Sequence, residues 1–312
     1  MGISDLLKLQ NLDMKRYTLI LTVLFAIMSC NSKVNPDMAG NIVVTATVNG
    51  LTKVGYEDGN LPTKFVMSVD QNAASKYDYF VEMTKTATGN IYSAAETLLW
   101  ASSDHKDVNI KAMTLPYGLT TLDKVDPMTV SVSLDQSLEA GLVASDLLGA
   151  STVDGVTIDG NNVKVAFNHL MSKLQVSYDF GPEFGNGPTV KSVMLKDICT
   201  TGGYNLSTMD YDSSIGTALG NVVMYHDASS QTAEAIFYPY DPSVNPTLAM
   251  CVVISGVEYE LTCPVVKSNG AFQGGRRYKL KVSIAGSSIG GASASIISGW
   301  DTETEDKDFV TE

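Results

Sequence analysis

The amino-acid sequence predicts an all-β protein with two tandem antiparallel β-sandwich domains. Charged residues make up only 18% of the chain while Gly, Ser, Thr and Asn recur throughout, a composition that favours short strands and turns over long helices. Short alternations of apolar and polar residues repeat along the chain, bounded by Gly, Asn, Asp or Pro. At 312 residues the chain exceeds what one sandwich needs, so we expect two domains of roughly 130 to 150 residues.

A change of phase within residues 163–180 predicts where the chain passes from one sheet to another. Apolar residues stand at odd positions before the change and at even positions after it: Val163, Val165 and Phe167, then Leu174, Val176, Tyr178 and Phe180. One continuous strand cannot bury both sets, because side chains alternate between its faces. We therefore expect a structural corner at Asn168, His169 and Lys173, a helical or wide turn with Asn168 as its cap and the His169 ring bonded to a backbone group. We place the domain boundary near residue 160, with the N-terminal sandwich over residues 41–160 and the C-terminal sandwich over residues 161–312.

The first 40 residues indicate export. Lys15 and Arg16 precede an apolar run at residues 17–28, which is shorter than the about 20 residues that a membrane-spanning helix needs. Ser29 and Cys30 follow, a small residue and a cysteine that together resemble the lipobox of bacterial lipoproteins, in which the cysteine is acylated and becomes the N-terminus. Residues 1–29 are then a leader with a lipoprotein signal peptide, and residues 30–40 a tether. The alternative is a plain signal peptide with a chance cysteine.

Alternating apolar residues predict the individual strands. In the N-terminal domain they lie at residues 44–48, 65–69, 77–83, 98–100, 108–112 and 128–134. In the C-terminal domain they lie at residues 190–195, 222–225, 235–238, 248–254, 257–261, 278–284 and 293–297. Residues 137–148 show helical periodicity, weakened by Gly141. The acidic tail after Trp300 is expected to be solvated or frayed.

Charge and motifs argue against nucleic-acid binding, metal binding and catalysis. The chain has 34 acidic and 21 basic residues, a formal charge of -13, which disfavours contact with nucleic-acid phosphates. The three histidines lie far apart in sequence and in no recognised metal or catalytic motif: His105, His169 and His226. Gly202-Gly203 and Gly274-Gly275 lack the context of a phosphate-binding loop and are interpreted as turns. We expect no cofactor, no metal and no enzymatic activity, although two carboxylates brought together by folding would escape sequence analysis.

Three cysteines remain after Cys30, namely Cys199, Cys251 and Cys263, so at least one thiol is free in a monomer. Cys251 and Cys263 flank a predicted hairpin, and a three-residue loop at residues 256–258 would place them opposite each other for a disulfide bond. The alternative is buried thiols, because all three lie in or beside apolar runs.

Five segments resemble the fimbrillins, the type V pilin lipoproteins of Bacteroides-type bacteria. Residues 167–174, FNHLMSKL, are similar to the family's F-x-H-x-x-(small)-K-L signature. Four further segments resemble family motifs in the same order along the chain: residues 113–117, 145–148, 274–280 and 297–300. With the lipobox, the resemblance covers nearly the whole exported chain.

The resemblance implies a specific fold and assembly route. Fimbrillins have two transthyretin-like β-sandwiches and reach the outer membrane as lipid-anchored precursors. A trypsin-like protease then removes the first strand, and a strand of another subunit fills the groove. In this chain the discarded strand would be residues 42–48, with processing after Lys53, where the family has arginine. An arginine-specific protease would not cut there, so either a lysine-tolerant enzyme acts, or the subunit stays uncut as an anchor, or Lys53 is an ordinary solvated lysine.

The resulting functional hypothesis is a structural fimbrial subunit or a tip or accessory protein, located on the cell surface and lipid-anchored to the outer membrane through Cys30. Its partners would be other fimbrial subunits and a host or bacterial surface ligand. The alternative is a surface glycan-binding lipoprotein, which requires an exposed aromatic platform. The candidates for that platform are Tyr77, Tyr79, Phe80, Trp100, Tyr238 and Tyr240.

Overall fold

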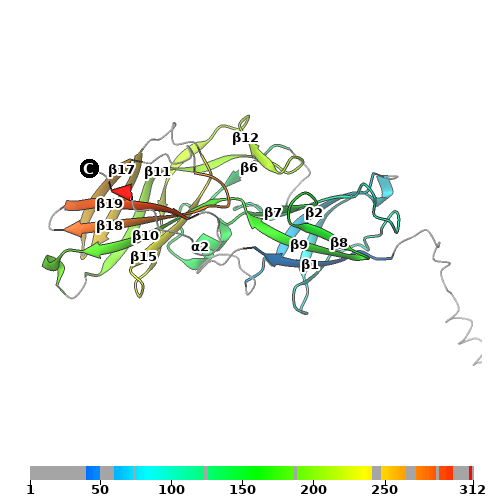
Figure 1. Cartoon of the computed structure of the whole chain (residues 1–312), viewed down its shortest axis with the longest axis horizontal. Coiled ribbons are helices and arrows are strands. Elements are labelled where there is room, and N and C mark those ends of the chain that lie inside the picture. The colour runs from blue at the N-terminus through cyan, green and yellow to red at the C-terminus, as the bar shows by residue number, and fades with distance from the viewer. Residues whose placement is uncertain are drawn as a thin grey trace, which may run out of the picture.

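The computed structural model of the chain shows an elongated all-β molecule (Figure 1). The structure describes residues 40–49, 60–72, 75–121, 126–185, 188–240, 247–264, 272–285, 288–297 and 309–310. The predicted dominance of short strands is confirmed, since α2, Glu139–Ala144, is the single α-helix in this part of the chain. Within the same residues no helix is long and apolar enough to span a membrane.

The first half of the molecule is one eight-stranded sheet in the order β1-β4-β3-β2-β5-β7-β9-β8. Its strands are β1 Val43–Val48, β2 Lys64–Asp70, β3 Tyr79–Lys85, β4 Ile91–Ser93, β5 Asn109–Thr114, β7 Leu148–Ser151, β8 Val156–Asp159 and β9 Asn162–His169. Because β1 also pairs with β9, the sheet curls round and closes in the manner of a barrel. Its interior is a hydrophobic cluster that includes Phe65, Trp100 and Phe167.

The second half consists of two six-stranded sheets that face each other across one core. One sheet has the order β14-β15-β10-β18-β19-β20, with β14 Tyr225–Asp227, β15 Thr232–Phe237, β10 Ser172–Phe180, β18 Arg277–Ala285, β19 Ser288–Ile297 and β20 Phe309–Val310. The other has β12 Asp210–Asp212, β11 Val190–Asn205, β16 Thr247–Ile254 and β17 Val257–Pro264, with β13 Ala218–Val223 and β6 Met128–Ser131 also paired to β11. Short 3-10 turns lie at Ser75–Tyr77 and Pro182–Phe184.

The phase change predicted a corner between two strands, and the structure has one. β9 ends at His169 in the first sheet and β10 begins at Ser172 in the second half. The corner is tighter than expected, because Leu170 and Met171 alone separate the strands. Asn168 does not cap a turn: it lies inside β9 and pairs with Gly149 of β7, a sheet partner that the sequence did not reveal.

Hydrogen bonding divides the chain differently from the expected ranges of residues 41–160 and 161–312. β9 belongs to the first sheet, whereas β6, expected in the N-terminal domain, pairs with β11 in the second half. The predicted helix of residues 137–148 shrinks to α2, because Leu148 begins β7. Gly141 is required inside α2, since a Cβ there would lie 2.4 Å from the Asp135 carbonyl oxygen.

The hairpin of β16 and β17 does not place Cys251 opposite Cys263, as the proposed disulfide bond would require. Its loop is the two residues Ser255 and Gly256, both with positive φ, not the three-residue loop considered from the sequence. This register places Cys251 opposite Glu260 and Cys263 opposite Leu248. Cys251 and Cys199 are buried free thiols.

Candidate functional site

Strand β1 is held on both of its edges in the first half of the molecule. It runs parallel to β9 along its whole length, from the pair Val43–Asn162 to the pair Val48–Phe167, and antiparallel to β4 on the other side. Figure 1 shows β1 and β9 side by side, both running toward the second half. Removal of β1 would therefore expose backbone N–H and C=O groups along two neighbouring strands.

The side chains of β1 alternate between the core and the surface. Val44, Ala46 and Val48 are 0%, 1% and 4% exposed, whereas Thr47 points to solvent. In the same hydrophobic cluster, the Phe65 ring lies 4.8 Å from the Tyr92 ring and 5.1 Å from the Phe167 ring, measured between centroids. We call the space that β1 fills the β1 groove, bounded by β4, β9 and these three rings. It is an apolar trough between two strand edges, suited to an extended segment.

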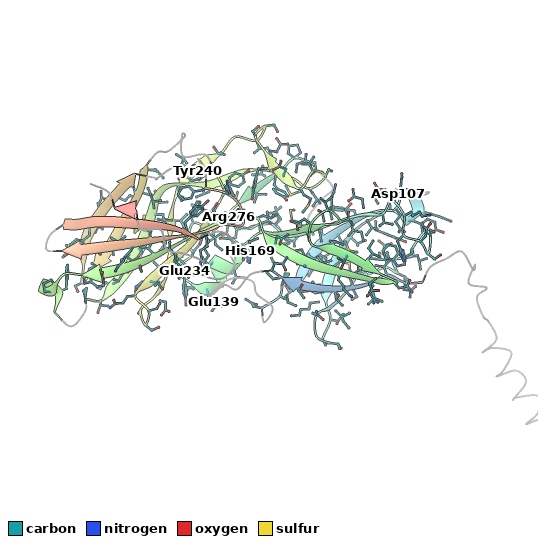
Figure 2. The ribbon with its side chains drawn as sticks, viewed as in Figure 1. Asp107, Glu139, His169, Glu234, Tyr240 and Arg276 are labelled. Atoms are coloured by element: carbon teal, nitrogen blue, oxygen red, sulfur yellow. The ribbon has the colours of Figure 1, made fainter. Side chains whose placement is uncertain are left out.

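Two of the predicted corner residues each meet a buried carboxylate, His169 as a hydrogen-bonded pair and Lys173 as an ion pair. Figure 2 labels His169 and Glu234. His169 Nδ1 lies 2.9 Å from the Asp146 carboxylate, and Lys173 Nζ lies 2.7 Å from the Glu234 carboxylate. All four side chains are at most 3% exposed. Burial lowers the pKa of Lys173, and the neighbouring Glu234 carboxylate opposes that shift. The histidine partner is thus a carboxylate, not the backbone group expected from the sequence.

Asn168 connects the end of β1 to the turn after β7. The Asn49 side-chain amide donates to Asn168 Oδ1 at 2.8 Å, and Asn168 Nδ2 donates to Asp154 Oδ2 at 2.9 Å. Next to this chain of amides lies a pocket of about 400 Å³ between the first sheet and the turn after β11, lined by residues that include Lys111 and Met209. The Lys111 ammonium reaches from β5 to the turn after β11, where it donates to the Ser207 carbonyl oxygen.

The sequence did not reveal the carboxylate partners of His169 and Lys173. Asp146 stands within the segment 145–148 that was noted for its resemblance, so its position was visible but not its pairing with His169. Glu234 carried a weaker signal, as a lone acid inside the apolar strand β15. Cys30 and Lys53, predicted as the lipidation and processing sites, lie outside the described residues.

The structure brings together neither a metal site nor an aromatic platform in the part of the chain that it describes. No group of three or more His, Cys, Asp and Glu residues could hold a metal ion there. Of the aromatic residues proposed for glycan binding, Trp100, Tyr238 and Tyr240 are buried. Tyr77, Tyr79 and Phe80 are partly buried, and Tyr79 and Phe80 pack against the two cores.

A family model described as fimbrillin-like matches residues 52–300. The chain belongs to the fimbrillin-like family. Fimbrillins are structural subunits of cell-surface fimbriae rather than enzymes, so contacts with other fimbrial subunits are part of this protein's role. The segment 167–174 that carried the resemblance is the end of β9, the corner and the start of β10.

Solved structures share the fold of this fimbrillin-like chain. The crystal structure of a proposed cell adhesion protein from Bacteroides uniformis is 19% identical, with a TM-score of 0.57 over 84% of this chain and 98% of that one. One from Bacteroides ovatus, also a proposed cell adhesion protein, is 16% identical, with a TM-score of 0.59 over 86% of this chain and 99% of that one. Among curated proteins no sequence matches significantly.

Proposed function

We propose that this fimbrillin-like protein is a stalk, tip or accessory subunit that joins its neighbours by exchanging β1 for a strand of another subunit. The observation that carries the proposal is the β1 groove. β1 pairs on both edges and contributes three core side chains, yet residues 49–63 are its only covalent link to β2 and the strands that follow. A cut in that connection leaves β1 held by non-covalent contacts alone.

The proposed processing site is Lys53, five residues after the end of β1 at Val48. Each hydrogen bond regained by a new strand contributes about 0.5–1.5 kcal/mol net, and each buried valine about 1.5–3 kcal/mol. The joint between subunits would accordingly dissociate slowly. In this proposal the two halves of the molecule correspond to the two transthyretin-like sandwiches of fimbrillins.

Mild trypsin treatment of the purified precursor tests this route. We expect cleavage after Lys53, identified by mass spectrometry, together with a ladder of oligomers on native gels. The control is Lys53→Gln, which should give neither the cut nor the ladder. Cleavage after Lys53 that leaves the protein monomeric would contradict strand exchange.

We further propose that the precursor is exported as a lipoprotein and anchored in the outer membrane through Cys30. Acyl chains on the cysteine would supply the anchor, at about 0.8 kcal/mol per buried methylene. Cells fed labelled palmitate should yield a labelled protein in the outer-membrane fraction, and Cys30→Ala should abolish the label. A labelled Cys30→Ala protein would show that the lipid is attached elsewhere.

A further inference from the structure

We propose that the β1 groove selects its incoming strand by a pattern of three alternate positions: a β-branched residue, a small residue and a second β-branched residue. The strand would come from another subunit and run parallel to β9. This inference rests on the proposed function, because it specifies which partner segment the exchange accepts.

The two outer positions of the pattern are those of Val44 and Val48. Val44 lies opposite Tyr92 of β4, and Val48 lies opposite Phe167 of β9. Both valines are buried, so each fills a space beside one of these aromatic rings. A polar residue at either position would be buried without a partner, at a cost to binding.

The central position is that of Ala46, a small residue. The Phe65 ring extends from β2 and contacts the Tyr92 and Phe167 rings at once. Since Tyr92 and Phe167 lie beside Val44 and Val48, we infer that Phe65 fills the core beneath the residue between them, Ala46. Ala46 is 1% exposed, and close-packed interiors accept added methylenes only with strain.

The floor of the groove is built by strands other than β1. Phe65, Tyr92 and Phe167 belong to three other strands, and the Tyr92 hydroxyl is held by donation to the Pro62 carbonyl oxygen at 2.6 Å. Any strand that replaces β1 would therefore face the same limits on the size of its buried side chains.

The end of the groove favours an amide after the pattern and sets the direction of the strand. The Asn49 backbone N–H donates to the Phe167 carbonyl oxygen at 2.7 Å, and its side chain donates to Asn168. A strand parallel to β9 with an amide side chain at this position would restore both bonds. A reversed strand would place the residue that follows the pattern at the opposite end of the groove, away from the Phe167 carbonyl oxygen and Asn168.

Peptide exchange into the full chain tests the pattern. The protein carries a site-specific protease sequence in place of residues 52–55 and is cut there. The probes are fluorescent peptides of residues 41–49, unaltered, with Ala46→Leu, or with Thr47→Leu as the matched control, since Thr47 faces solvent. We expect the Ala46→Leu peptide to bind about tenfold more weakly or worse, and the Thr47→Leu peptide to stay within about twofold of the unaltered one.

A compensating change in the protein sharpens the test. Phe65→Leu opens the floor, so the disadvantage of the Ala46→Leu peptide should shrink in that variant, measured as a ratio to the unaltered peptide. Equal binding of all three peptides to the unaltered protein would overturn the size pattern while leaving strand exchange intact. Failure of the unaltered peptide to exchange at all would overturn the proposed function and this inference together.

Discussion

Lys173 carries a buried charge at the corner between β9 and β10. Its side chain is fully buried beside Glu234, whose other oxygen accepts from Gln175 at 2.7 Å. The phase change in the sequence located Lys173 and His169 at a corner. It could not identify their partners, because Asp146 is 23 positions away from His169 and Glu234 lies on a different strand of the second half.

Loss of the Lys173 ammonium should leave the Glu234 carboxylate buried without its counter-charge. We expect Lys173→Met to lower the free energy of unfolding by about 3–5 kcal/mol, measured by denaturant titration. The double variant Lys173→Met, Glu234→Gln should recover much of that loss, because it removes the charge and keeps an acceptor for Gln175. The control is Lys164→Met, which breaks the exposed pair with Asp159 and should cost about 0–1 kcal/mol. Equal effects of the two lysine variants would show that the buried pair is not coupled to folding.

At the scale of elements, β11 shows how sequence signals can mislead. Gly202 and Gly203 were interpreted as a turn, yet both lie inside this strand, which pairs with β6 and β12 there. Glycine is needed at residue 202 because the Tyr238 ring lies close to the backbone there. A Cβ on Gly202 would lie 2.3 Å from the Tyr238 ring, whose hydroxyl donates to the Gly203 carbonyl oxygen at 2.5 Å. Contacts of this kind join residues that no local pattern relates.

Gly202→Ala should therefore force the Tyr238 ring out of its position over β11. We expect a loss of about 1–3 kcal/mol in the free energy of unfolding, typical of overpacked sites. Gly216→Ala is the matched control, because no atom lies within 4 Å of its added methyl group and its φ is not positive. A thermal midpoint for Gly202→Ala that equals the control's would mean that the ring moves aside freely.

At the scale of the whole molecule, the first half of the sequence completes the second core. The chain leaves the first sheet after β5, contributes β6 and α2 to the second half, and returns with β7. We call residues 128–147, which run from β6 to the start of β7, the excursion. Buried side chains of the excursion belong to the larger core cluster: Met128, Val130, Val132, Leu142 and Leu147. The three-dimensional division of the molecule therefore differs from any single cut in the sequence.

Separation of the chain at residue 160 should consequently leave both pieces incomplete. Residues 161–312 alone would lack β6 and α2, and we expect them to bind a hydrophobic dye and to show poorly dispersed NMR signals. Co-expression with residues 41–160 should restore order if the excursion docks in trans. Cooperative folding of residues 161–312 on their own would show that the excursion is dispensable.

Alkaline pH should destabilise the whole molecule through its buried tyrosines. Burial raises the pKa of five of them above the ordinary value of 10.0, and that of Tyr238 to about 12: Tyr178, Tyr204, Tyr238, Tyr240 and Tyr278. A group whose pKa is higher in the folded state contributes stability that is complete below its unfolded pKa and is lost as pH rises. The unfolding midpoint in denaturant should be lower at pH 11 than at pH 8. The difference should persist in high salt, which screens surface repulsion but not buried groups, and an unchanged midpoint would contradict this account.

The sequence by itself determined the all-β class, most strand positions, the corner between β9 and β10 and the family resemblance that the family model confirms. These features are local, because alternation and turn residues act over a few positions along the chain. Only the tertiary structure decided that β1 pairs in parallel with β9, that β6 crosses to the second half, and that His169 and Lys173 meet Asp146 and Glu234. Such pairings join distant segments, and they depend on which edges and core spaces the rest of the fold leaves open.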